Sequence, residues 1–314
     1  MSDRFAGTVG VPLAALLACV GCDLANVEVV VPVPDVMVVE ATAVLTVDPT
    51  HPAPGHAHIL AIATRYPDRG HPHPVHGASI RVTGESGQSM QLSEEMDPVP
   101  NCVDRDFFGA CYRGGSPLSP FDPGEMLSLE VVLPDGGVLY GTSRMPGTFS
   151  ASDLALEDGR CRLSPDTNYR FKWAPVEGAA AYLAELGVGG VGEMEVDDRV
   201  SWTTVLIGND LSEVAFPRGL LAVLEVTDPD LAGELRTGLP EGAVADIALG
   251  AVDLNWTNWI REGRINLSGD VRVPSVFGDG TGWFGTAVRW RLSVESREAN
   301  GDNDLPLCGP PLAD

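Results

Sequence analysis

Glycine and proline divide this chain into short, strand-like runs, and this punctuation is the feature that most constrains its fold. The 314 residues include 36 Gly and 25 Pro. Both residues weaken helices and favour turns. The runs between them are rich in Val, Ile and Leu and partly alternate with polar residues, and no stretch keeps a long 3.6-residue period. We therefore predict a mostly β protein with one or two short helices.

Residues 36–148 are predicted to form an immunoglobulin-like, regulatory-type β-sandwich with antiparallel strands. Its expected strands are residues 36–47, 57–63, 78–83, 90–92, 127–133 and 138–143. Segment 133–138 reads Leu-Pro-Asp-Gly-Gly-Val. Because Pro presets φ and Gly tolerates positive φ, this segment predicts a hairpin turn between the last two strands.

Residues 149–314 are predicted to form a second β-rich domain that resembles a fibronectin type III sandwich and ends in a C-terminal tail. Segment 169–173 alternates aromatic and basic residues, a Pro/Gly turn follows, and Tyr182 begins the returning strand. Two facing sheets need large aromatic side chains from adjacent strands, and Trp173 and Tyr182 would meet that need. Further strands are expected at 200–207, 245–254 and 284–295, short helices at 230–237 and 257–262, and either element at 220–226.

The N-terminus carries a short apolar segment, residues 9–21, that ends in small residues and cysteine. It is shorter than the roughly 18 apolar residues that a membrane span needs, and it is typical of a cleaved bacterial lipoprotein signal. We therefore predict a signal peptide at residues 1–21 and a lipidated tether at residues 22–35. Cys19 and Cys22 both follow a lipobox-like tripeptide, so either could carry the lipid.

The number of cysteines bears on this choice. The chain has six cysteines. Lipidation of Cys22 removes Cys19 with the signal and leaves an even number of cysteines, which suits disulfides in an oxidising compartment. Lipidation of Cys19 leaves an odd number, so one cysteine would be unpaired. Parity therefore favours Cys22. The other four are Cys102, Cys111, Cys161 and Cys308. A local pair between the first two would leave the last two to pair, although four cysteines allow three pairings.

The charge balance limits the partners that the chain can bind. It has 44 acidic and 20 basic residues, a formal net charge of −24. Nucleic acid favours proteins of the opposite sign, so no nucleic-acid partner is expected. Adhesion to anionic lipid headgroups is disfavoured for the same reason, and membrane attachment should therefore come from the lipid anchor.

All six histidines lie between His51 and His76, around the expected strand 57–63. Three converging histidines suffice to bind zinc or copper. The candidate ligands are His56, His58, His71, His73 and His76. The prolines in segment 71–76 limit how it can wrap an ion, and an exposed polar turn is the simpler interpretation. If strand 57–63 pairs with strand 78–83 as a hairpin, the two histidine groups lie at opposite ends of the first strand.

Three further patterns have both a chemical and a simpler structural interpretation. Trp256, Trp259 and Trp283 could form an aromatic platform for sugar rings or part of a core. The glycine-dense segment 277–285 lacks the lysine and the following helix of a phosphate cradle, and it predicts a tight loop before the last strand. Segment 300–304 lacks the spacing of a calcium loop, which favours a solvated acidic turn. The sequence contains no hydrolase or nucleotide-binding motif, and we expect no catalytic residues.

Several segments together resemble a large family of bacterial cell-envelope lipoproteins of unknown function. The matching residues are 38–40, 74–82, 123–124, 127–131, 134–136, 145–146, 251–256 and 273–285. The resemblance implies a lipobox, a sandwich similar to carboxypeptidase regulatory domains, and a less regular C-terminal half. It implies no catalytic residues. It also implies an envelope location, with the outer membrane favoured over the inner membrane, and an association with TonB-dependent receptors.

We therefore expect a non-enzymatic interaction or receptor-accessory module that is lipid-anchored and faces the periplasm or the exterior. Its partners would be the membrane, through the lipid, and a TonB-dependent receptor or another envelope protein. No cofactor is expected in this hypothesis. The alternative is a periplasmic metal-binding protein that uses residues 51–76 to hold zinc or copper.

Overall fold

The computed structural model describes residues 35–50, 55–68, 70–96, 109–151, 153–192, 194–196, 199–206, 212–262, 273–299 and 304–312. The chain divides after Val33, and Pro34–Asp314 form one compact unit. The expected signal peptide and both candidate lipidation sites, Cys19 and Cys22, lie outside the described residues.

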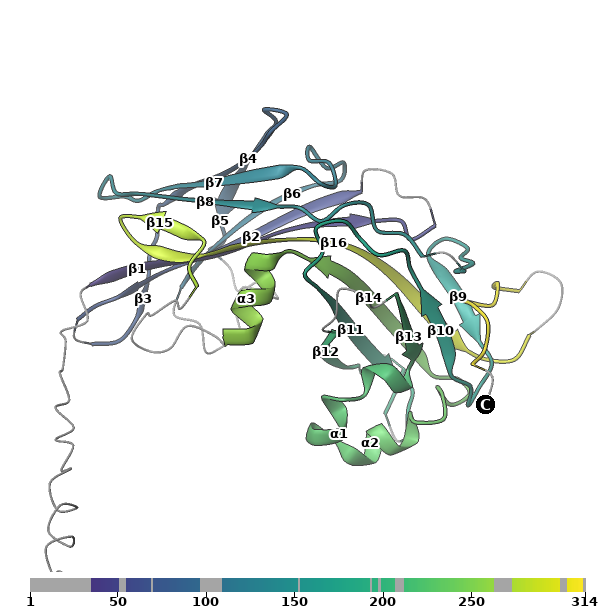
Figure 1. Ribbon diagram of the computed structural model, residues 1–314. Helices are drawn as coiled ribbons and strands as arrows, with labels where there is room; N and C mark the ends of the chain where they lie inside the picture. Colours follow the sequence, from purple (N-terminus) through teal and green to yellow (C-terminus); the bar gives the residue numbers. More distant parts are fainter. Residues whose placement is uncertain are drawn as a thin grey trace, which may run out of the picture. The chain divides into compact units, whose positions relative to one another are not determined.

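β-Strands dominate the described part of the chain (Figure 1). The strands are β1 (Val36–Val47), β2 (His56–Tyr66), β3 (His73–Pro74), β4 (Ser79–Gly84), β5 (Ser89–Glu94), β6 (Ala110–Ser116), β7 (Met126–Val132), β8 (Val138–Arg144), β9 (Arg160–Leu163), β10 (Tyr169–Lys172), β11 (Ala181–Gly189), β12 (Val200–Leu206), β13 (Glu213–Phe216), β14 (Val244–Val252), β15 (Val276–Gly278) and β16 (Thr281–Ser296). The helical segments are η1 (Arg218–Leu220), α1 (Leu224–Thr227), α2 (Pro229–Glu234) and α3 (Leu254–Glu262). The prediction of a mostly β chain is confirmed. None of the helices in the described ranges has the length and apolar character that crossing a membrane requires.

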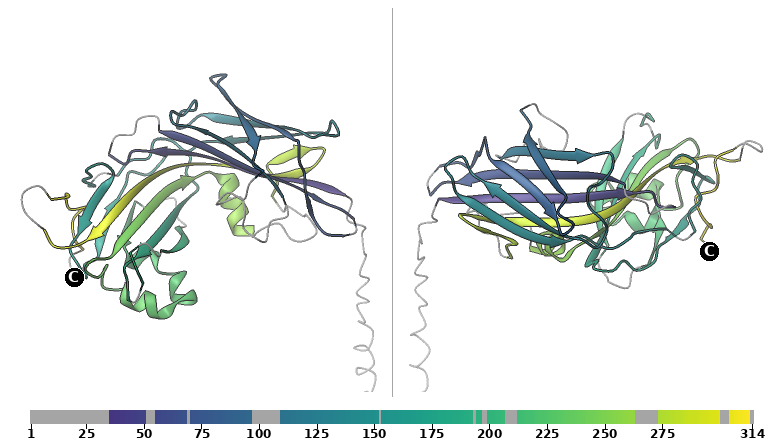
Figure 2. Two further views of the ribbon diagram at one scale, coloured as in Figure 1. Left: turned by 180° about the vertical axis from the view of Figure 1, so that it is seen from behind. Right: turned by 90° about the horizontal axis from the view of Figure 1, so that it is seen from above.

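Nine strands close into a ring. Its order is β1-β2-β6-β5-β4-β7-β8-β15-β16, and β16 returns to β1 through a parallel pairing. This pairing covers ten register positions, beginning with Val38 opposite Thr281, and Figure 2 shows the two strands side by side. Alternate side chains such as Leu45, Ile59 and Leu129 are buried in the core. A strand from near the end of the chain therefore completes a barrel that the N-terminal strands begin.

This closed ring corrects the expectation of an immunoglobulin-like sandwich for residues 36–148. A sandwich has two separate sheets that face each other, whereas here each strand pairs with the next around the whole circuit. The strands that complete the circuit, β15 and β16, come from residues 276–296, so residues 36–148 do not complete their sheet alone. Alternation along a strand identifies its buried face but not the strand that lies beside it.

A second set of strands extends this sheet beyond the ring. β14, β11 and β12 follow β16 in that order, and each is antiparallel to its neighbour. β9 lies parallel to the last residues of β16. We call β9, the last residues of β16, β14, β11 and β12 the wing sheet. Because β16 belongs to both the ring and the wing sheet, the boundary expected at residue 148 does not separate two sheets.

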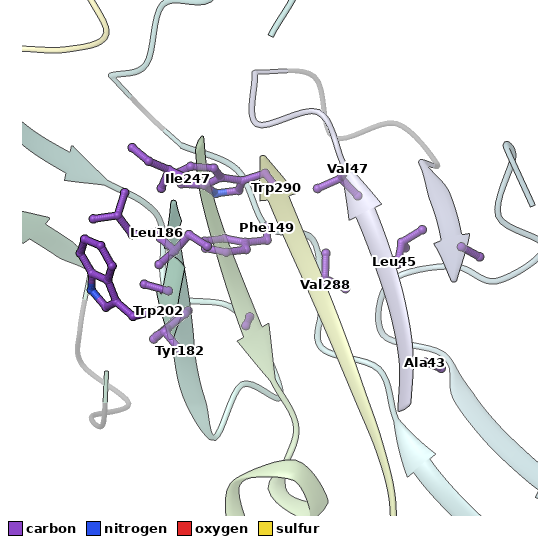
Figure 3. Close-up of a cluster of buried hydrophobic side chains, with 14 of the residues drawn as sticks. Ala43, Leu45, Val47, Phe149, Tyr182, Leu186, Trp202, Ile247, Val288 and Trp290 are labelled. Carbon is purple, nitrogen blue, oxygen red and sulfur yellow. The ribbon is translucent and has the colours of Figure 1, made fainter. Parts of the chain in front are cut away.

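Aromatic side chains fill the core on the inner face of the wing sheet (Figure 3). The ring centroid of Phe149 lies 5.8 Å from that of Tyr182 and 5.9 Å from that of Trp290. Trp173 packs against Tyr182 at 5.2 Å. All four side chains are buried. The expectation that Trp173 and Tyr182 share one core is confirmed. β10 and β13, which pair as a separate two-stranded sheet, add Phe171 to the same core.

Most expected strands are present, with small shifts at their ends, but β3, β6, β9, β13 and β15 were not predicted, and one expected pairing is wrong. β6 lies between the expected strands 90–92 and 127–133, where no strand was expected, because its sequence ACYRGGS has only a short apolar run before two glycines. β2 pairs with β1 and β6 rather than with β4, so the hairpin between 57–63 and 78–83 is wrong. The expected helices at 230–237 and 257–262 correspond to α2 and α3, and 220–226 is partly helical.

A disulfide joins Cys161 in β9 to Cys308 near the C-terminus, across 147 residues. Both cysteines are fully buried. The backbone N–H of Cys308 donates to the carbonyl oxygen of Arg162 at 3.0 Å, so the C-terminal tail is fixed beside β9. This pairing agrees with the expectation from the sequence. Cys111 is also disulfide-bonded, whereas Cys102 lies outside the described residues.

The ring and the wing sheet diverge at a buried carboxylate, that of Asp253, which follows β14 and is 4% exposed. It accepts hydrogen bonds from Ser143 Oγ of β8 at 2.6 Å, from Thr286 N of β16 at 3.2 Å, and from Trp256 N of α3 at 3.0 Å. Burial raises the pKa of Asp253, and these hydrogen bonds oppose the rise. The carboxylate therefore links two diverging strands and caps α3.

Candidate functional site

A column of small residues runs along the outer face of β14. The inward side chains of β14 face the aromatic core, whereas Asp246, Ala248 and Gly250 lie on the opposite, outer face of the strand. β16 places Arg291 opposite Ala248 and Arg289 opposite Gly250. Because the β14 side chains are short and the neighbouring ones are long, the outer face is hollowed along β14. We call this hollow the β14 groove.

β11 supplies the other wall of the β14 groove. Glu185 lies opposite Ala248, and Leu183 lies opposite Gly250. The following outward position on β11 is Gly187, which keeps the groove open toward β12. A Cβ atom at Gly187 would lie 3.0 Å from Ser201 Oγ, so any larger side chain there would narrow this part of the groove.

The wide end of the β14 groove is polar and has a volume of about 690 Å³. Arg199 forms an ion pair with Asp246 there, and Ser293 Oγ donates to the same carboxylate at 2.6 Å. β12 contributes the hydroxyl-bearing side chains of Ser201 and Thr203. This end therefore offers charged groups of both signs and several hydrogen-bonding groups to a ligand.

Charged side chains also flank the middle of the groove. Glu185 Oε2 lies 3.4 Å from Arg289 Nη1 and 3.8 Å from Arg291 Nη2. Burial and the neighbouring Arg291 lower the pKa of Arg289, and Glu185 opposes this change. The Arg291 side chain is 58% exposed and its contact with Glu185 is long, so it can turn toward a ligand without the loss of a strong ion pair.

The narrow end of the groove is apolar and has a volume of about 30 Å³. It is lined by Val44, Leu183, Val252 and Ala287 from the strands and by Trp256 from α3. The narrow and wide ends share lining residues, so they form one groove. Between residues 246 and 252 it extends for roughly 20 Å, since a strand rises about 3.3 Å per residue. A ligand that fills it is extended, with one apolar end and one polar end.

The three tryptophans of the proposed platform come together beside the narrow end. Trp259 stacks on Trp283 with centroids 4.7 Å apart, and Trp256 lies 5.9 Å from Trp283. The indole N–H groups of Trp259 and Trp283 both donate to Glu40 Oε1, at 3.3 and 3.2 Å. Trp283 is only 4% exposed. The cluster therefore packs α3 against the outer face of β1 and β16, as the core interpretation expected, and presents no open face of Trp283 to a sugar.

The structure separates the histidines into two groups. His56 and His58 lie at the start of β2, whereas His73 in β3 pairs with Arg65 near its end. The two groups therefore lie at opposite ends of β2, but the hairpin with 78–83 from which this arrangement was expected does not form. The described residues contain no group of three His, Cys, Asp or Glu residues that could hold a metal ion. His51 lies outside the described residues.

Individual histidines have local partners instead. His76 Nδ1 lies 2.5 Å from Glu94 Oε1, and the N–H of Gly77 donates to the other oxygen of this carboxylate. His58 Nε2 lies 3.4 Å from Arg113 Nε, and burial together with Arg113 lowers the pKa of His58. A lowered pKa keeps His58 neutral beside the arginine. His71 is exposed in the segment before β3.

Two other sequence patterns have structural roles. The glycine-dense segment 277–285 forms the end of β15, a tight turn and the start of β16, as expected for a loop before the last strand. Asp304 contacts Arg297 and Arg162, whereas residues 300–303 lie outside the described residues.

The β14 groove was not predicted from the sequence. The run VADIALGAV of β14 shows an alternation that indicates a strand. Its outward small residues carry no chemical signature, because alanine and glycine occur in many strands for packing reasons. Only the register with β11 and β16 shows that long charged side chains stand on both sides of them.

The chain matches no protein-family model and no curated protein. Among solved structures it is similar to a DUF4785 family protein from Legionella pneumophila, with 11% sequence identity, coverage of 64% of this chain and 50% of that chain, and a TM-score of 0.21. It is also similar to DIP-gamma IG1+IG2, with 8% identity, coverage of 83% and 98%, and a TM-score of 0.20. The chicken CNTN1 FN1-FN3 domains give 8% identity, coverage of 84% and 69%, and a TM-score of 0.17. TM-scores this low carry no argument about the function of this chain.

Proposed function

We propose that this chain is a non-enzymatic binding module of the bacterial cell envelope that holds an extended ligand or partner segment in the β14 groove. The observation that carries the proposal is the groove itself, which has a volume of about 690 Å³ at its wide end. Its floor is made of small residues, and its charged side chains are Arg199, Asp246, Glu185 and Arg291. Binding sites are concave and place a few polar groups where they fix the orientation of a ligand.

The envelope location is proposed from the cysteines and the N-terminal sequence. The Cys161–Cys308 disulfide and the disulfide-bonded Cys111 are typical of an oxidising compartment. A lipid on Cys22, with Cys19 as the alternative, would attach the module to a membrane, and we favour the outer membrane. A partner such as a TonB-dependent receptor fits a module with this location and no catalytic role.

A groove-filling substitution tests the binding function. Ala248→Trp places a large side chain on the floor of the groove, whereas Ser128→Trp places the same side chain on the exposed outer face of β7 and serves as the matched control. Both variants and the native chain are purified from native membranes, and their bound molecules are identified by mass spectrometry. We expect a molecule that is retained by the native chain and by Ser128→Trp and lost by Ala248→Trp. Equal retention by all three proteins would contradict the proposal.

The same preparations test the anchor. Mass spectrometry of the mature N-terminus should show a lipidated Cys22 as the first residue. A lipidated Cys19 that precedes an unmodified Cys22 would show that the parity argument chose the wrong cysteine. An N-terminus without lipid would remove the support for membrane attachment.

A further inference from the structure

β12 is the last strand of the wing sheet, and within the described residues only one of its edges has a partner strand. It pairs with β11 at seven consecutive register positions, from Val200 opposite Val188 to Leu206 opposite Tyr182. An unpaired edge presents a row of backbone N–H and C=O groups at the spacing of another extended chain. The chemistry of this edge therefore matches a polypeptide strand.

β12 lacks the features by which natural sheets block their edges. Such edges carry charged side chains, prolines, bulges or very short strands. The sequence of β12, VSWTTVL, contains no charged residue and no proline, and its register with β11 has no bulge. Within the described residues, none of these devices blocks the free edge of β12.

The inner side chains hold β12 in an extended conformation. Trp202 Nε1 donates to the carbonyl oxygen of Leu220 at 2.8 Å, and Thr204 Oγ1 donates to the same oxygen at 3.1 Å. Trp202 and Thr204 are both buried. Because these contacts fix the strand before any partner arrives, an added strand would not have to order it, and this reduces the entropic cost of binding.

The outer side chains of β12 connect its edge to the β14 groove. Ser201 and Thr203 are exposed, short, and part of the groove lining. A strand added beside β12 would place every second side chain beside this lining, close to Arg199 and within reach of Glu185, which lies opposite Thr203 on β11. Main-chain pairing would then supply affinity, and the groove would select side chains.

We propose that β12 takes up an extended, net-basic segment of a partner polypeptide as an added strand, whose outward side chains lie beside the β14 groove. This inference rests on the proposed binding function and names the chemical class of its partner. The formal net charge of −24 favours a basic segment, because opposite overall charge speeds the encounter between the two chains. The same charge on two copies opposes their association, so a second copy of this chain is the less favourable occupant.

A synthetic strand tests the inference directly. The probe is a fluorescein-labelled octapeptide, Thr-Lys-Val-Lys-Thr-Lys-Val-Lys, added to the full mature chain with its disulfides intact. We expect saturable binding by fluorescence anisotropy and at least tenfold slower hydrogen exchange at backbone amides of β12. The same peptide with Glu in place of Lys should bind at least tenfold more weakly. Absence of binding by the basic peptide, or equal binding by both peptides, would overturn the proposal.

Backbone methylation separates strand addition from adhesion by charge. Consecutive amides of a strand point to opposite edges. Two peptides are therefore compared, one N-methylated at its odd-numbered residues and the other at its even-numbered residues. Only one of them loses the N–H groups that would bond to β12. One methylated peptide should lose binding and the other should keep it. Equal binding of the two would mean that no strand is added. The N–H groups of residues 203 and 204 likewise point to opposite edges of β12, so a proline at one of them removes a donor from the free edge and a proline at the other disturbs the pairing with β11. Of Thr203→Pro and Thr204→Pro, the variant that remains folded with its β11 pairing intact should lose the peptide.

Two outcomes separate this inference from the proposed function. If Ala248→Trp loses the native ligand but the two methylated peptides bind equally, the groove binds something other than an added strand, and only the inference fails. If the peptide does not bind and Ala248→Trp retains every native ligand, both proposals fail. Sedimentation of the chain alone tests the other occupant: a dimer that the edge-blocking proline dissociates would overturn the choice of a foreign strand.

Discussion

Replacement of Asp253 should destabilise the whole unit, because this carboxylate holds the point where the ring and the wing sheet diverge. Asp253→Ala removes the acceptor of Thr286 N, which belongs to a fully buried residue, and the acceptor of Trp256 N in the first turn of α3. A buried N–H without a partner costs about 1–3 kcal/mol. The lost helix cap costs about 1 kcal/mol. The free energy of unfolding should therefore fall by about 2–4 kcal/mol in total.

Asp253→Asn should cost much less. Its amide oxygen can still accept from Thr286 N and Trp256 N, and its amide N–H can donate to Ser143 Oγ. Ser143 can then donate to Thr286 Oγ1, 2.9 Å away, which donates to the carbonyl oxygen of Arg144. Because burial raises the pKa of Asp253, its ionisation is less favourable in the folded state than in the unfolded chain. The native protein should therefore lose stability as pH rises from 3.8 through the folded-state pKa, and the asparagine variant should lack this component.

Urea unfolding followed by tryptophan fluorescence measures these differences, since all six tryptophans lie at or beyond Trp173. The matched control is Asp228→Ala, because Asp228 is exposed and caps helix α2 through a single bond to Leu231 N at 3.1 Å. It should cost about 1 kcal/mol. If Asp253→Ala costs no more than this control, or if Asp253→Asn costs as much as Asp253→Ala, the role assigned to the buried carboxylate is wrong.

Three further changes have expected outcomes. Replacement of Cys161 and Cys308 by serine opens a loop of 147 residues and should lower the free energy of unfolding in urea by about 5 kcal/mol, the loop-entropy value; no change would show that the bond does not form. Burial and Arg113 lower the pKa of His58 from 6.5, so the unfolded chain binds that proton more readily and stability should fall as pH drops below about 6.5. His58→Gln should flatten this decline in pH-dependent thermal melts, and an unchanged slope would contradict the assignment. Trp259→Ala removes the stacked partner of a buried tryptophan and should cost about 3 kcal/mol in the same urea assay, the low end for a large side chain because Trp259 is only partly buried; an unchanged free energy of unfolding would contradict its packing role.

Local features of the fold could be read from the sequence because they depend on neighbouring residues. The run 36–47 is a strand with the predicted bounds, and the Pro-Asp-Gly-Gly turn does join β7 to β8. The pairing of Trp173 with Tyr182 in one core also followed from a short stretch of sequence. β6 is an informative exception. Its two glycines argued against a strand, yet its register with β2 extends over seven residues.

The candidate site was only partly accessible to sequence reasoning. The three tryptophans, Trp256, Trp259 and Trp283, could be named in advance. The hydrogen bonds from two of them, Trp259 and Trp283, to Glu40 join residues more than two hundred positions apart and could not. The β14 groove depends on three strands in register, and small residues such as Gly250 signal nothing until their neighbours are known. The open edge of β12 likewise depends on which strand ends the sheet.

The sequence by itself determined that this chain forms strands, which face of each strand is buried, and how its charge limits its partners. Period-two alternation and turn residues carry this information, because both act over a few neighbouring positions. Only the tertiary structure decided that β16 lies beside β1 and closes a ring rather than a sandwich. Strand pairing is a choice among distant segments with similar buried faces, and the combined packing of the whole core, not any single run of residues, makes that choice.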